Sequence, residues 1–199
     1  AARYFAGTKP LSVAVGDFNR DGQQDLVAAN SGTDDATVLL GSGDGAFTTA
    51  GRYAAGDAPV LVAVGDFDGD GAQDLVTANS LSSDVTVLLG HGDGTFTAPI
   101  RYAAGAAPVS VAVGDFDGDG AQDLVTANSG FMDVSVLLGH GDGTFAAAAR
   151  YFAGTKPLSV AVGDFDGDGL QDLATANQLS DDVAVLLGHG DGTFAAAVK

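Results

Sequence analysis

Aspartates recur in this chain at spacings that suit a metal-binding loop. In residues 66–74, carboxylates occupy positions 1, 3, 5 and 9, and glycine stands at position 6. On a tightly turned backbone, carboxylates two residues apart direct their oxygens at one point, where they would repel one another without a cation. A flexible, all-oxygen ligand set suits Ca²⁺ better than Mg²⁺. The stretch therefore predicts a calcium site.

This loop occurs four times at a constant step of 49 residues, and the copies are here called acidic loops 1 to 4. They span residues 17–25, 66–74, 115–123 and 164–172. Loop 1 carries Asn19 at position 3 and Arg20 where the other loops have glycine. An EF-hand is the rival interpretation, but it needs a glutamate at position 12 and flanking helices. Position 12 is alanine or threonine in this chain, and strands are predicted on both sides, so the EF-hand hypothesis fails.

The composition favours a turn-rich, all-β protein. The chain has 199 residues and a formal net charge of −18, and all 26 acidic residues are aspartate, which favours turns and metal loops over helices. Only 8 basic residues are present and they form no cluster, so nucleic acid is not an expected partner. No apolar run approaches the ~20 residues of a membrane helix, so membrane insertion is not expected either.

The cell location has to be inferred from calcium. The chain has no cysteine, which leaves the redox compartment undetermined, and no signal peptide is visible. It begins within a repeat, at a segment that matches residues 149–152, which indicates a mature fragment or a piece produced for expression, with any leader absent. Because calcium outside cells would fill loops of modest affinity, we expect an extracellular or periplasmic location.

Each repeat predicts four short strands joined by turns. Apolar residues alternate at period two before each acidic loop, and a second short strand follows the loop. A loop whose content differs between repeats leads to the third strand, and a glycine-dense hairpin leads to the fourth. In the second repeat these strands are predicted at residues 60–65, 74–78, 85–89 and 95–103.

A four-stranded meander leaves both faces uncovered, so the copies must stack on one another. Four-stranded sheets arranged radially around an axis form a β-propeller. The sequence thus predicts one all-β propeller domain of four antiparallel, four-stranded blades within residues 1–199. Phenylalanines that recur once per repeat, such as Phe67 and Phe96, are expected to pack between blades. The predicted repeats are residues 3–51, 52–100, 101–149 and 150–199.

The residues GDFDGDG followed by DLV, and then VLLGxGDGxF, resemble the FG-GAP/VCBS repeat. The resemblance covers essentially the whole chain in four in-register copies. That repeat builds integrin α-subunit-like propellers and many secreted bacterial propellers. The resemblance implies one blade per repeat, Ca²⁺ in the loop between the first and second strands, and a role in adhesion or ligand binding. Some relatives are lectins.

Carried over from the family, each ion would be bound by the side chains at positions 1, 3, 5 and 9 and by the backbone carbonyl at position 7. The resemblance implies about four Ca²⁺ ions per chain, which are expected to be structural because each loop commits its aspartates to one ion. Loop 1 is expected to bind calcium most weakly, because it has one carboxylate fewer and a nearby arginine. The implied ligands are Asp17, Asn19, Asp21, Gln23, Asp25, Asp66, Asp68, Asp70, Ala72, Asp74, Asp115, Asp117, Asp119, Ala121, Asp123, Asp164, Asp166, Asp168, Leu170 and Asp172.

No catalytic constellation is recognisable in the sequence. His91, His140 and His189 share one hairpin position but occur one per blade, so they are interpreted as exposed turn residues and not as a zinc or catalytic site. The aspartates of the same hairpins, such as Asp93, are interpreted as turn-forming, with a second cation site as the alternative. There is no Ser/His/Asp grouping, no GxSxG elbow and no cysteine nucleophile. The chain is therefore predicted not to be an enzyme.

A ligand site is expected on the loops that differ between repeats. In a meander blade, the acidic loops and the hairpins share one face, and the variable loops and Gly-x-x-Pro turns share the other. Because recognition is usually located on loops that a rigid scaffold holds, we expect a glycan or a protein to bind opposite the calcium face. Phe131 and Met132 lie in the third variable loop. Three interpretations are open: the pair anchors a ligand, forms a patch for self-association, or is buried. Tyrosines such as Tyr53 are expected to pack along their strand.

The number of blades leaves the closure of the ring open. Four blades is the lower limit for a propeller, and relatives of this family have around seven. Residues 1–7 match the end of an outer strand and residues 193–199 match its beginning, so the termini could close a ring within one chain or between two. We expect a homodimer that closes an eight-bladed ring, over a lone four-bladed ring or a piece of a larger protein. The alternative function is a self-assembling structural scaffold, recently amplified or engineered, without a small-molecule ligand.

Overall fold

The computed structural model describes residues 2–197, and this range contains fifteen β-strands and no helix. Blade 1 consists of β1 (Pro10–Gly16), β2 (Asp25–Asn30), β3 (Asp35–Gly41) and β4 (Phe47–Ala54). Blade 2 consists of β5 (Pro59–Gly65), β6 (Asp74–Asn79), β7 (Asp84–Leu88) and β8 (Ile100–Ala103). Blade 3 consists of β9 (Pro108–Gly114), β10 (Asp123–Asn128), β11 (Asp133–Leu137) and β12 (Ala149–Phe152). Blade 4 consists of β13 (Pro157–Gly163), β14 (Asp172–Asn177) and β15 (Asp182–Leu186).

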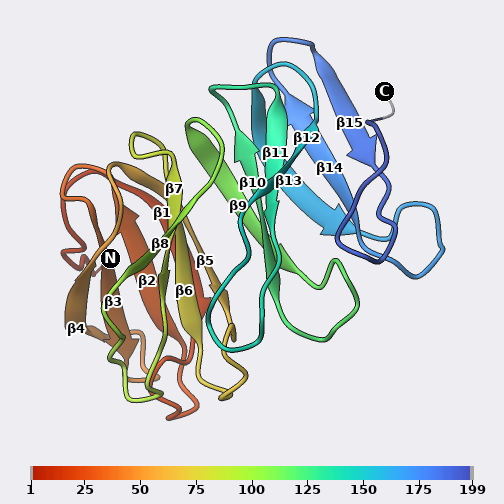
Figure 1. Ribbon diagram of the computed structural model, residues 1–199. Helices are drawn as coiled ribbons and strands as arrows, with labels where there is room; N and C mark the ends of the chain where they lie inside the picture. The colour runs from red at the N-terminus through yellow and green to blue at the C-terminus, as the bar shows by residue number, and fades with distance from the viewer. Residues whose placement is uncertain (1, 198–199) are drawn as a thin grey trace.

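Each blade is an antiparallel meander whose strands pair in chain order (Figure 1). The four blades follow one another along the chain, and their first strands, β1, β5, β9 and β13, lie side by side. This confirms the prediction of an all-β array with one antiparallel sheet per repeat. The predicted repeat boundaries fall inside the outer strands β4, β8 and β12, because the fourth strand of each blade runs on into the next 49-residue unit.

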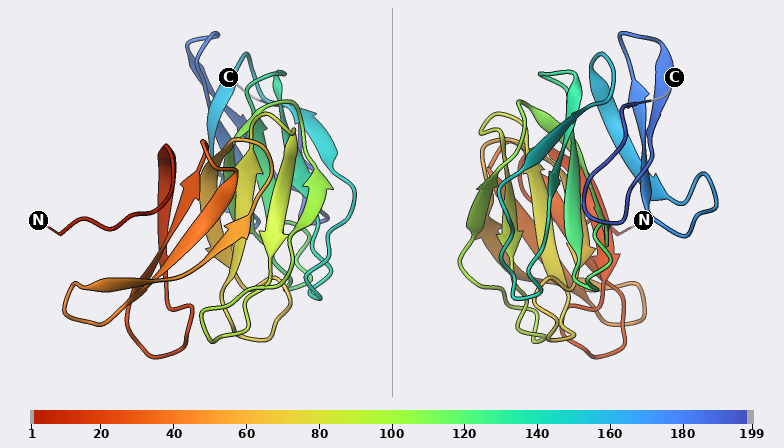
Figure 2. Two further views of the ribbon diagram at one scale, coloured as in Figure 1. Left: turned by 90° about the vertical axis from the view of Figure 1, so that its left-hand side faces the viewer. Right: turned by 45° about the vertical axis from the view of Figure 1, so that its right-hand side comes forward.

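The four blades form an open arc and do not close on themselves. Blade 1 lies at one end of the arc and blade 4 at the other, with the chain termini far apart (Figures 1 and 2). The end faces are uncovered: Val13 on β1 is 63% exposed, whereas its equivalent Val62 on β5 is 4% exposed between two blades. A lone, closed four-bladed ring is therefore not the structure of this chain.

The core consists of layers between neighbouring blades, in which aromatic rings pack among valine, leucine and alanine side chains. Phe67 of blade 2 is buried, and its ring lies edge to face against Phe145 of blade 3, at a centroid distance of 5.6 Å. Tyr102 of β8 contacts the same Phe145 at 5.4 Å. Edge-to-face pairs contribute about 0.5–1.5 kcal/mol beyond the apolar area they bury. Phe67 and Phe145 thus pack between blades, as predicted for the recurring phenylalanines, and Tyr102, which was predicted to pack along its strand, joins the same layer.

The outer strand departs from the prediction in blades 2, 3 and 4, and blade 3 repeats the shortened strand of blade 2. In blade 2 the strand predicted over residues 95–103 is regular only from Ile100, with an isolated bridge at Phe96. Thr97 N–H donates to Leu89 O, yet Ile100 pairs with Val87, so the outer strand carries one extra residue, a bulge that interrupts the ladder. Blade 4 has three strands within the described residues, because the residues equivalent to β8 begin at 198. Residues 1, 198 and 199, which belong to the predicted closing strand, lie outside the described residues.

Within residues 2–197, the structure contains no helix long and apolar enough to span a membrane.

Candidate metal centres and ligand groove

Each acidic loop connects the first and second strands of its blade, and glycine shapes the turn. In loop 2, between β5 and β6, Gly69 and Gly71 have φ angles of +72° and +81°, which glycine adopts without strain. The Gly71 N–H donates to Asp66 Oδ2 at 3.0 Å, and the Ala72 N–H donates to Asp70 Oδ1 at 2.5 Å. The loop is therefore held in its turned form by its own backbone donors.

The turn gathers carboxylates in three of the four loops. In loop 2, one oxygen each from Asp66, Asp68 and Asp70 lie within 4.8 Å of one another. Loops 3 and 4 gather the aspartates of positions 1, 3 and 9 equally closely: Asp115, Asp117 and Asp123, and Asp164, Asp166 and Asp172. Like charges at this separation repel unless a cation lies between them. These clusters are compatible with a bound metal ion.

One oxygen of loop 2 supports this interpretation. Oδ1 of Asp66 is buried and accepts no hydrogen bond from the described residues, whereas Oδ2 accepts the Gly71 N–H. An unsatisfied buried polar group costs about 1–3 kcal/mol, and more when it is charged. A divalent ion among the three carboxylates would satisfy this oxygen, and hard oxygen donors are the ligands that such an ion prefers. The residues present therefore fit the ion that the loop spacing predicts.

The predicted ligands at positions 7 and 9 have separate structural roles. The buried Asp74, at position 9, accepts the backbone N–H of Phe67 and of Gly90, each at 2.7 Å. It thereby ties the acidic loop to the hairpin between the third and fourth strands. The position-7 residues Gln23, Ala72, Ala121 and Leu170 donate their backbone N–H to the position-5 aspartate of their own loop. Those aspartates are Asp21, Asp70, Asp119 and Asp168.

Burial changes the protonation of two position-9 carboxyls, those of Asp74 and Asp123. It raises the pKa of Asp74 to about 6, and the nearby Asp68 and Asp66 carboxylates add to the rise. Burial likewise raises the pKa of Asp123 to about 6. Two backbone N–H donors oppose the rise in each case. In the absence of a cation, these two carboxyls are therefore partly protonated near pH 6.

We expect the Asp74 and Asp123 carboxyls to titrate near pH 6 in excess chelator and well below that in excess calcium, as followed by carboxyl ¹³C chemical shifts. Their pKa in the folded protein lies above the ordinary aspartate pKa of about 3.9. Between these two pH values the metal-free fold therefore binds more protons than the unfolded chain. Their contribution to the free energy of unfolding is thus fully present below about pH 4 and is lost as the pH rises through about 6. Titration at an ordinary aspartate pKa in chelator would show that the sites are not desolvated.

Loop 1 differs from the others in the structure as well as in sequence. Asn19 Nδ2 donates to Asp21 Oδ2 at 2.9 Å, so the Asn19 amide hydrogen-bonds a carboxylate that was predicted to bind the ion. The Arg20 guanidinium reaches loop 2, with Nη2 3.0 Å from Asp70 O and 3.4 Å from Asp70 Oδ1. Within the described residues, loop 1 is not among the clusters of three carboxylates.

We expect loop 1 to have the lowest calcium affinity of the four, and the double variant Asn19→Asp/Arg20→Gly to raise its affinity about tenfold or more, because ligand charge sets the affinity of such loops. Calorimetric titration with a competing chelator measures each class of site. The matched control is Arg101→Gly, which removes a cation whose contacts, Asp84 and Ala55, lie outside the acidic loops. Four sites of equal affinity in the unmodified chain would refute the expectation.

In acidic loops 1, 2 and 3, a glutamine from the next blade positions the predicted first ligand. The Asp66 N–H donates to Gln122 Oε1 of blade 3 at 2.8 Å. The same bond joins Asp17 to Gln73 at 2.7 Å and Asp115 to Gln171 at 2.9 Å. Sequence analysis missed this contact, although a glutamine recurs at position 8 of every loop. The backbone of the predicted first ligand is therefore anchored to the neighbouring blade in these three loops.

The histidines of the hairpins do not join the acidic clusters of the described residues. In the hairpin of His91, Asp93 Oδ1 accepts the side-chain hydroxyl and the backbone N–H of Thr95, at 2.5 and 2.9 Å. These bonds lower the pKa of Asp93, the side-chain bond most of all. Asp93 is thus a turn-forming residue, as interpreted from the sequence.

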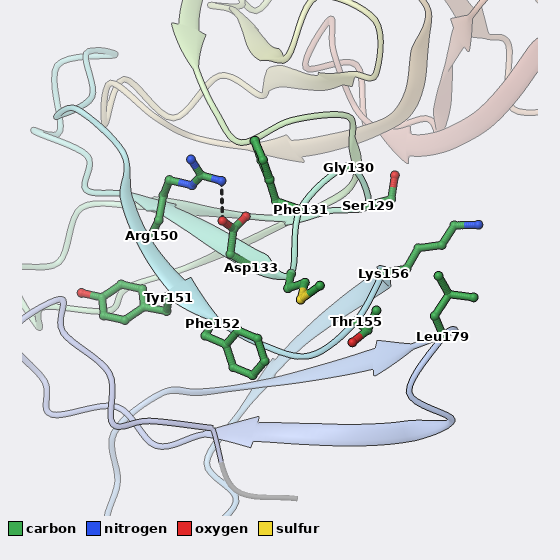
Figure 3. Close-up of a pocket in the computed structure, with 11 residues that line it drawn as sticks. Ser129, Gly130, Phe131, Asp133, Arg150, Tyr151, Phe152, Thr155, Lys156 and Leu179 are labelled. Atoms are coloured by element: carbon green, nitrogen blue, oxygen red, sulfur yellow. Dashed lines mark hydrogen bonds and ion pairs between the residues drawn. The ribbon is translucent and has the colours of Figure 1, made fainter.

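A groove of about 520 Å³ lies on the opposite face, between the variable loop of blade 3 and the loops of blade 4 (Figure 3). Its apolar walls come from Phe131, Met132, Phe152 and Leu179, all of them exposed. Phe131 and Met132 are each 51% exposed, so burial does not account for them. Lys156 lines the same groove.

Charged groups hold one wall of this groove. The Arg150 guanidinium lies over the Phe131 ring, 4.6 Å from its centroid, and forms an ion pair with Asp133 (Figure 3). The hydroxyls of Ser129 and Thr155 also line the groove. Aromatic faces with a few convergent polar groups are typical of a small-molecule binding site.

Family models match most of the chain. The model described as FG-GAP-like repeat matches residues 17–77, 66–126 and 115–175, and the model described as FG-GAP repeat matches residues 157–197. Among curated proteins, none matches this chain in sequence.

Solved propeller structures share the fold at low sequence identity. A putative 6-phosphogluconolactonase from Bacteroides fragilis NCTC 9343 superposes with a TM-score of 0.72 at 18% identity, over 94% of this chain and 53% of that one. The periplasmic gluconolactonase PpgL of Pseudomonas aeruginosa gives 0.66 at 19%, over 93% and 52%. BBS1N, solved in complex with ARL6DN and soaked with lead, gives 0.64 at 15%, over 94% and 55%. The chain spans about half the length of these structures.

These neighbours correct one prediction. The chain was predicted not to be an enzyme because it lacks a recognisable nucleophile or acid–base grouping, but two of the neighbours described above are named as lactonases. Such names belong to those proteins, and identities of 18–19% show the fold alone. The prediction that the chain is not an enzyme is nevertheless wrong. One fold can host both binding proteins and enzymes, so the absence of a known catalytic motif does not exclude catalysis.

Proposed function

This chain belongs to the FG-GAP repeat family, and from that premise we propose that it is a calcium-stabilised recognition module that binds a glycan in the groove between blades 3 and 4. The observation that carries the proposal is the position of the groove. It lies on the face opposite the acidic loops, where the loops differ between otherwise similar repeats. A rigid scaffold that presents variable loops is the usual arrangement of a binding protein.

The chemistry of the groove favours a sugar over a purely apolar ligand. The exposed rings of Phe131 and Phe152 offer flat apolar surfaces against which the C–H face of a pyranose can stack. Hydroxyls of the sugar would find donors and acceptors in Ser129, Asp133 and Lys156. The ammonium of Lys156 favours a glycan that carries a carboxylate.

We propose that the resident ion of acidic loops 2 to 4 is Ca²⁺, which those loops would bind through aspartate oxygens. The unpaired Asp66 Oδ1 and the clustering of the three carboxylates support a divalent cation, and the flexible all-oxygen set favours calcium over magnesium. Loops of modest affinity fill where calcium is abundant, so we propose an extracellular or periplasmic location. The periplasmic lactonase among the structural neighbours is compatible with that location.

A glycan array probed in calcium tests the ligand. We expect repeated binding to a class of acidic glycans, and Phe131→Ala or Phe152→Ala to weaken it about tenfold, the loss of about 1.4 kcal/mol. The matched control is Leu81→Ala, which removes an exposed apolar side chain from the corresponding loop of blade 2. Binding that survives both phenylalanine substitutions, or no glycan binding at all, would refute the groove as a lectin site, and capture of a protein ligand by the groove would replace it.

We also propose that the arc is half of an eight-bladed ring, which a second copy of the chain completes. Apolar side chains at both ends of the arc support this: Leu11 and Val13 on blade 1, and Phe165 and Val183 on blade 4, are all exposed. Exposed apolar surface of this kind is typical of an interface.

A further inference from the structure

The two ends of the arc are the two halves of a junction that already occurs three times inside it. At the junction of blades 3 and 4, Phe116 from blade 3 packs against Phe194 from blade 4, at 5.7 Å, and Tyr151 of β12 packs against the same ring at 5.4 Å. The other two internal junctions repeat this trio of rings. The fourth copy of the trio is divided between the two ends.

On blade 1, Tyr4 already lies against Phe47 at 5.4 Å, which supplies two of the three rings. The third ring is that of Phe165, which is 50% exposed at the far end of blade 4, whereas its equivalent Phe116 is 2% exposed. Each end therefore presents the part of the trio that the other end lacks.

The glutamine contact is divided in the same way. Gln24 on blade 1 occupies the position of Gln73, Gln122 and Gln171, and it is exposed. The equivalent acceptor for the Asp164 N–H of acidic loop 4 would come from the next blade, by analogy with the 2.9 Å bond from Asp115 N to Gln171 Oε1. Within the described residues, no glutamine from a following blade accepts the Asp164 N–H. The predicted first ligand of loop 4 therefore lacks the bond that positions its counterparts in loops 1 to 3.

Within the described residues, blade 4 has no fourth strand. The N-terminal residues of the chain repeat the sequence of the fourth strand of blade 3. Residues 2–18 are identical to residues 149–165, so the arm formed by residues 2–5 has the sequence of β12. β12 pairs with β11, with Tyr151 opposite Val134. In blade 4 the equivalent strand β15 is the edge of a three-stranded sheet. The arm is not part of a strand, and in Figure 2 it extends away from the sheets.

We propose that two copies of this chain close the ring by exchanging these arms: residues 2–5 of each copy add as the fourth strand to β15 of the other. Tyr4 then lies opposite Val183, Phe165 completes the ring trio with Phe47 and Tyr4, and Gln24 accepts the Asp164 N–H across the interface. This inference rests on the proposed eight-bladed assembly and adds the pairing that holds it and the residue that completes loop 4.

The geometry indicates that the edge strand β15 pairs with the arm of a second copy of this chain. The arm keeps its contact with Phe47 in the proposed dimer, so it adds to the partner's blade without leaving its own. The two ends of one chain lie far apart (Figure 1), which prevents the same pairing within the chain. A head-to-tail contact that is used twice by two copies closes a ring, and edge-strand pairing removes the exposed edge that β15 presents.

The test is a disulfide placed across the exchanged strand. The chain has no cysteine, so in the double variant Tyr4→Cys/Val183→Cys any bridge joins the two introduced thiols. Opposed residues of an antiparallel pair lie about 4.5–5.5 Å apart at Cα, within the range of a disulfide. We expect mild oxidation to convert the protein to a covalent species of twice the chain mass. The matched control is Tyr4→Cys/Leu81→Cys, which places the second thiol on an exposed loop of blade 2 and is expected not to cross-link.

Light scattering completes the test. The unmodified chain is expected to have twice the chain mass, and Val13→Asp to weaken the dimer at least tenfold, whereas Leu81→Asp leaves it unchanged. A monomeric unmodified chain would overturn both the ring and the exchange, without bearing on glycan binding. A dimer that forms no disulfide would overturn the exchange alone. A bridge within one chain, or a ladder of open oligomers, would overturn closure by two copies.

Discussion

Removing calcium with a chelator is expected to lower the thermal midpoint of this protein by about 15–30 °C. With calcium at about 100 times the dissociation constant, each loop stabilises the fold by about 2.7 kcal/mol, so loops 2 to 4 together contribute about 8 kcal/mol. A domain of this size loses about 2–4 °C for each kcal/mol. The midpoint is measured by circular dichroism or calorimetry in calcium and in excess chelator.

The triple variant Asp68→Asn/Asp117→Asn/Asp166→Asn is the matched control for that experiment. These position-3 aspartates accept a turn N–H through Oδ1, as in the 3.2 Å bond from Asp70 N to Asp68 Oδ1, and asparagine preserves this acceptor while removing the charge. We expect the variant to melt near the temperature of the chelated protein and to respond little to calcium. A shift of less than about 5 °C in the unmodified protein would mean that the ions do not stabilise the fold.

Truncating one buried ring between blades is expected to destabilise the protein nearly as much as emptying two loops. Phe67 is 1% exposed and packs against Phe145, so Phe67→Ala should cost about 3–5 kcal/mol, including the cavity that it leaves. The corresponding fall in the midpoint is about 10 °C. Because Phe67 adjoins Asp66, calcium affinity of loop 2 is expected to fall as well.

The exposed Phe152 provides the control for that substitution, because it is the same residue type in the same repeat array but is 57% exposed. Phe152→Ala should change the free energy of unfolding by less than about 1 kcal/mol. Equal losses for the two variants would show that the interblade layers are not the core.

The architecture followed from the sequence because the signals were repeated. Three patterns each occur four times: a strand with period-two alternation, a turn with glycine at fixed positions, and a recurrent phenylalanine. A pattern that matched by chance in one repeat would not have matched in the other three. The acidic loops were located for the same reason. The shortened outer strand was not foreseen, because a bulge adds one residue without changing the alternation of small and apolar residues that marks a strand.

Contacts between repeats were harder to predict than contacts within them. The bond from Asp66 N to Gln122 Oε1 joins residues 56 positions apart, and no local propensity signals it. The groove combines Phe131 and Lys156 with Leu179 of the following blade, so its existence depends on how two blades pack. The repeat count alone could not predict the open arc, since the angle between blades is a property of the layers between them.

The most direct test of the central claim is a crystal structure of the chain grown with calcium, with terbium-substituted crystals to locate the ions by anomalous scattering. We predict a strong peak in loops 2, 3 and 4, at about 2.3–2.6 Å from the carboxylate oxygens, with Asp66 Oδ1 among the ligands of the first of them. Loop 1 should show a weaker peak. Acidic loops that hold only water in crystals saturated with calcium, with their turns unchanged, would contradict the account.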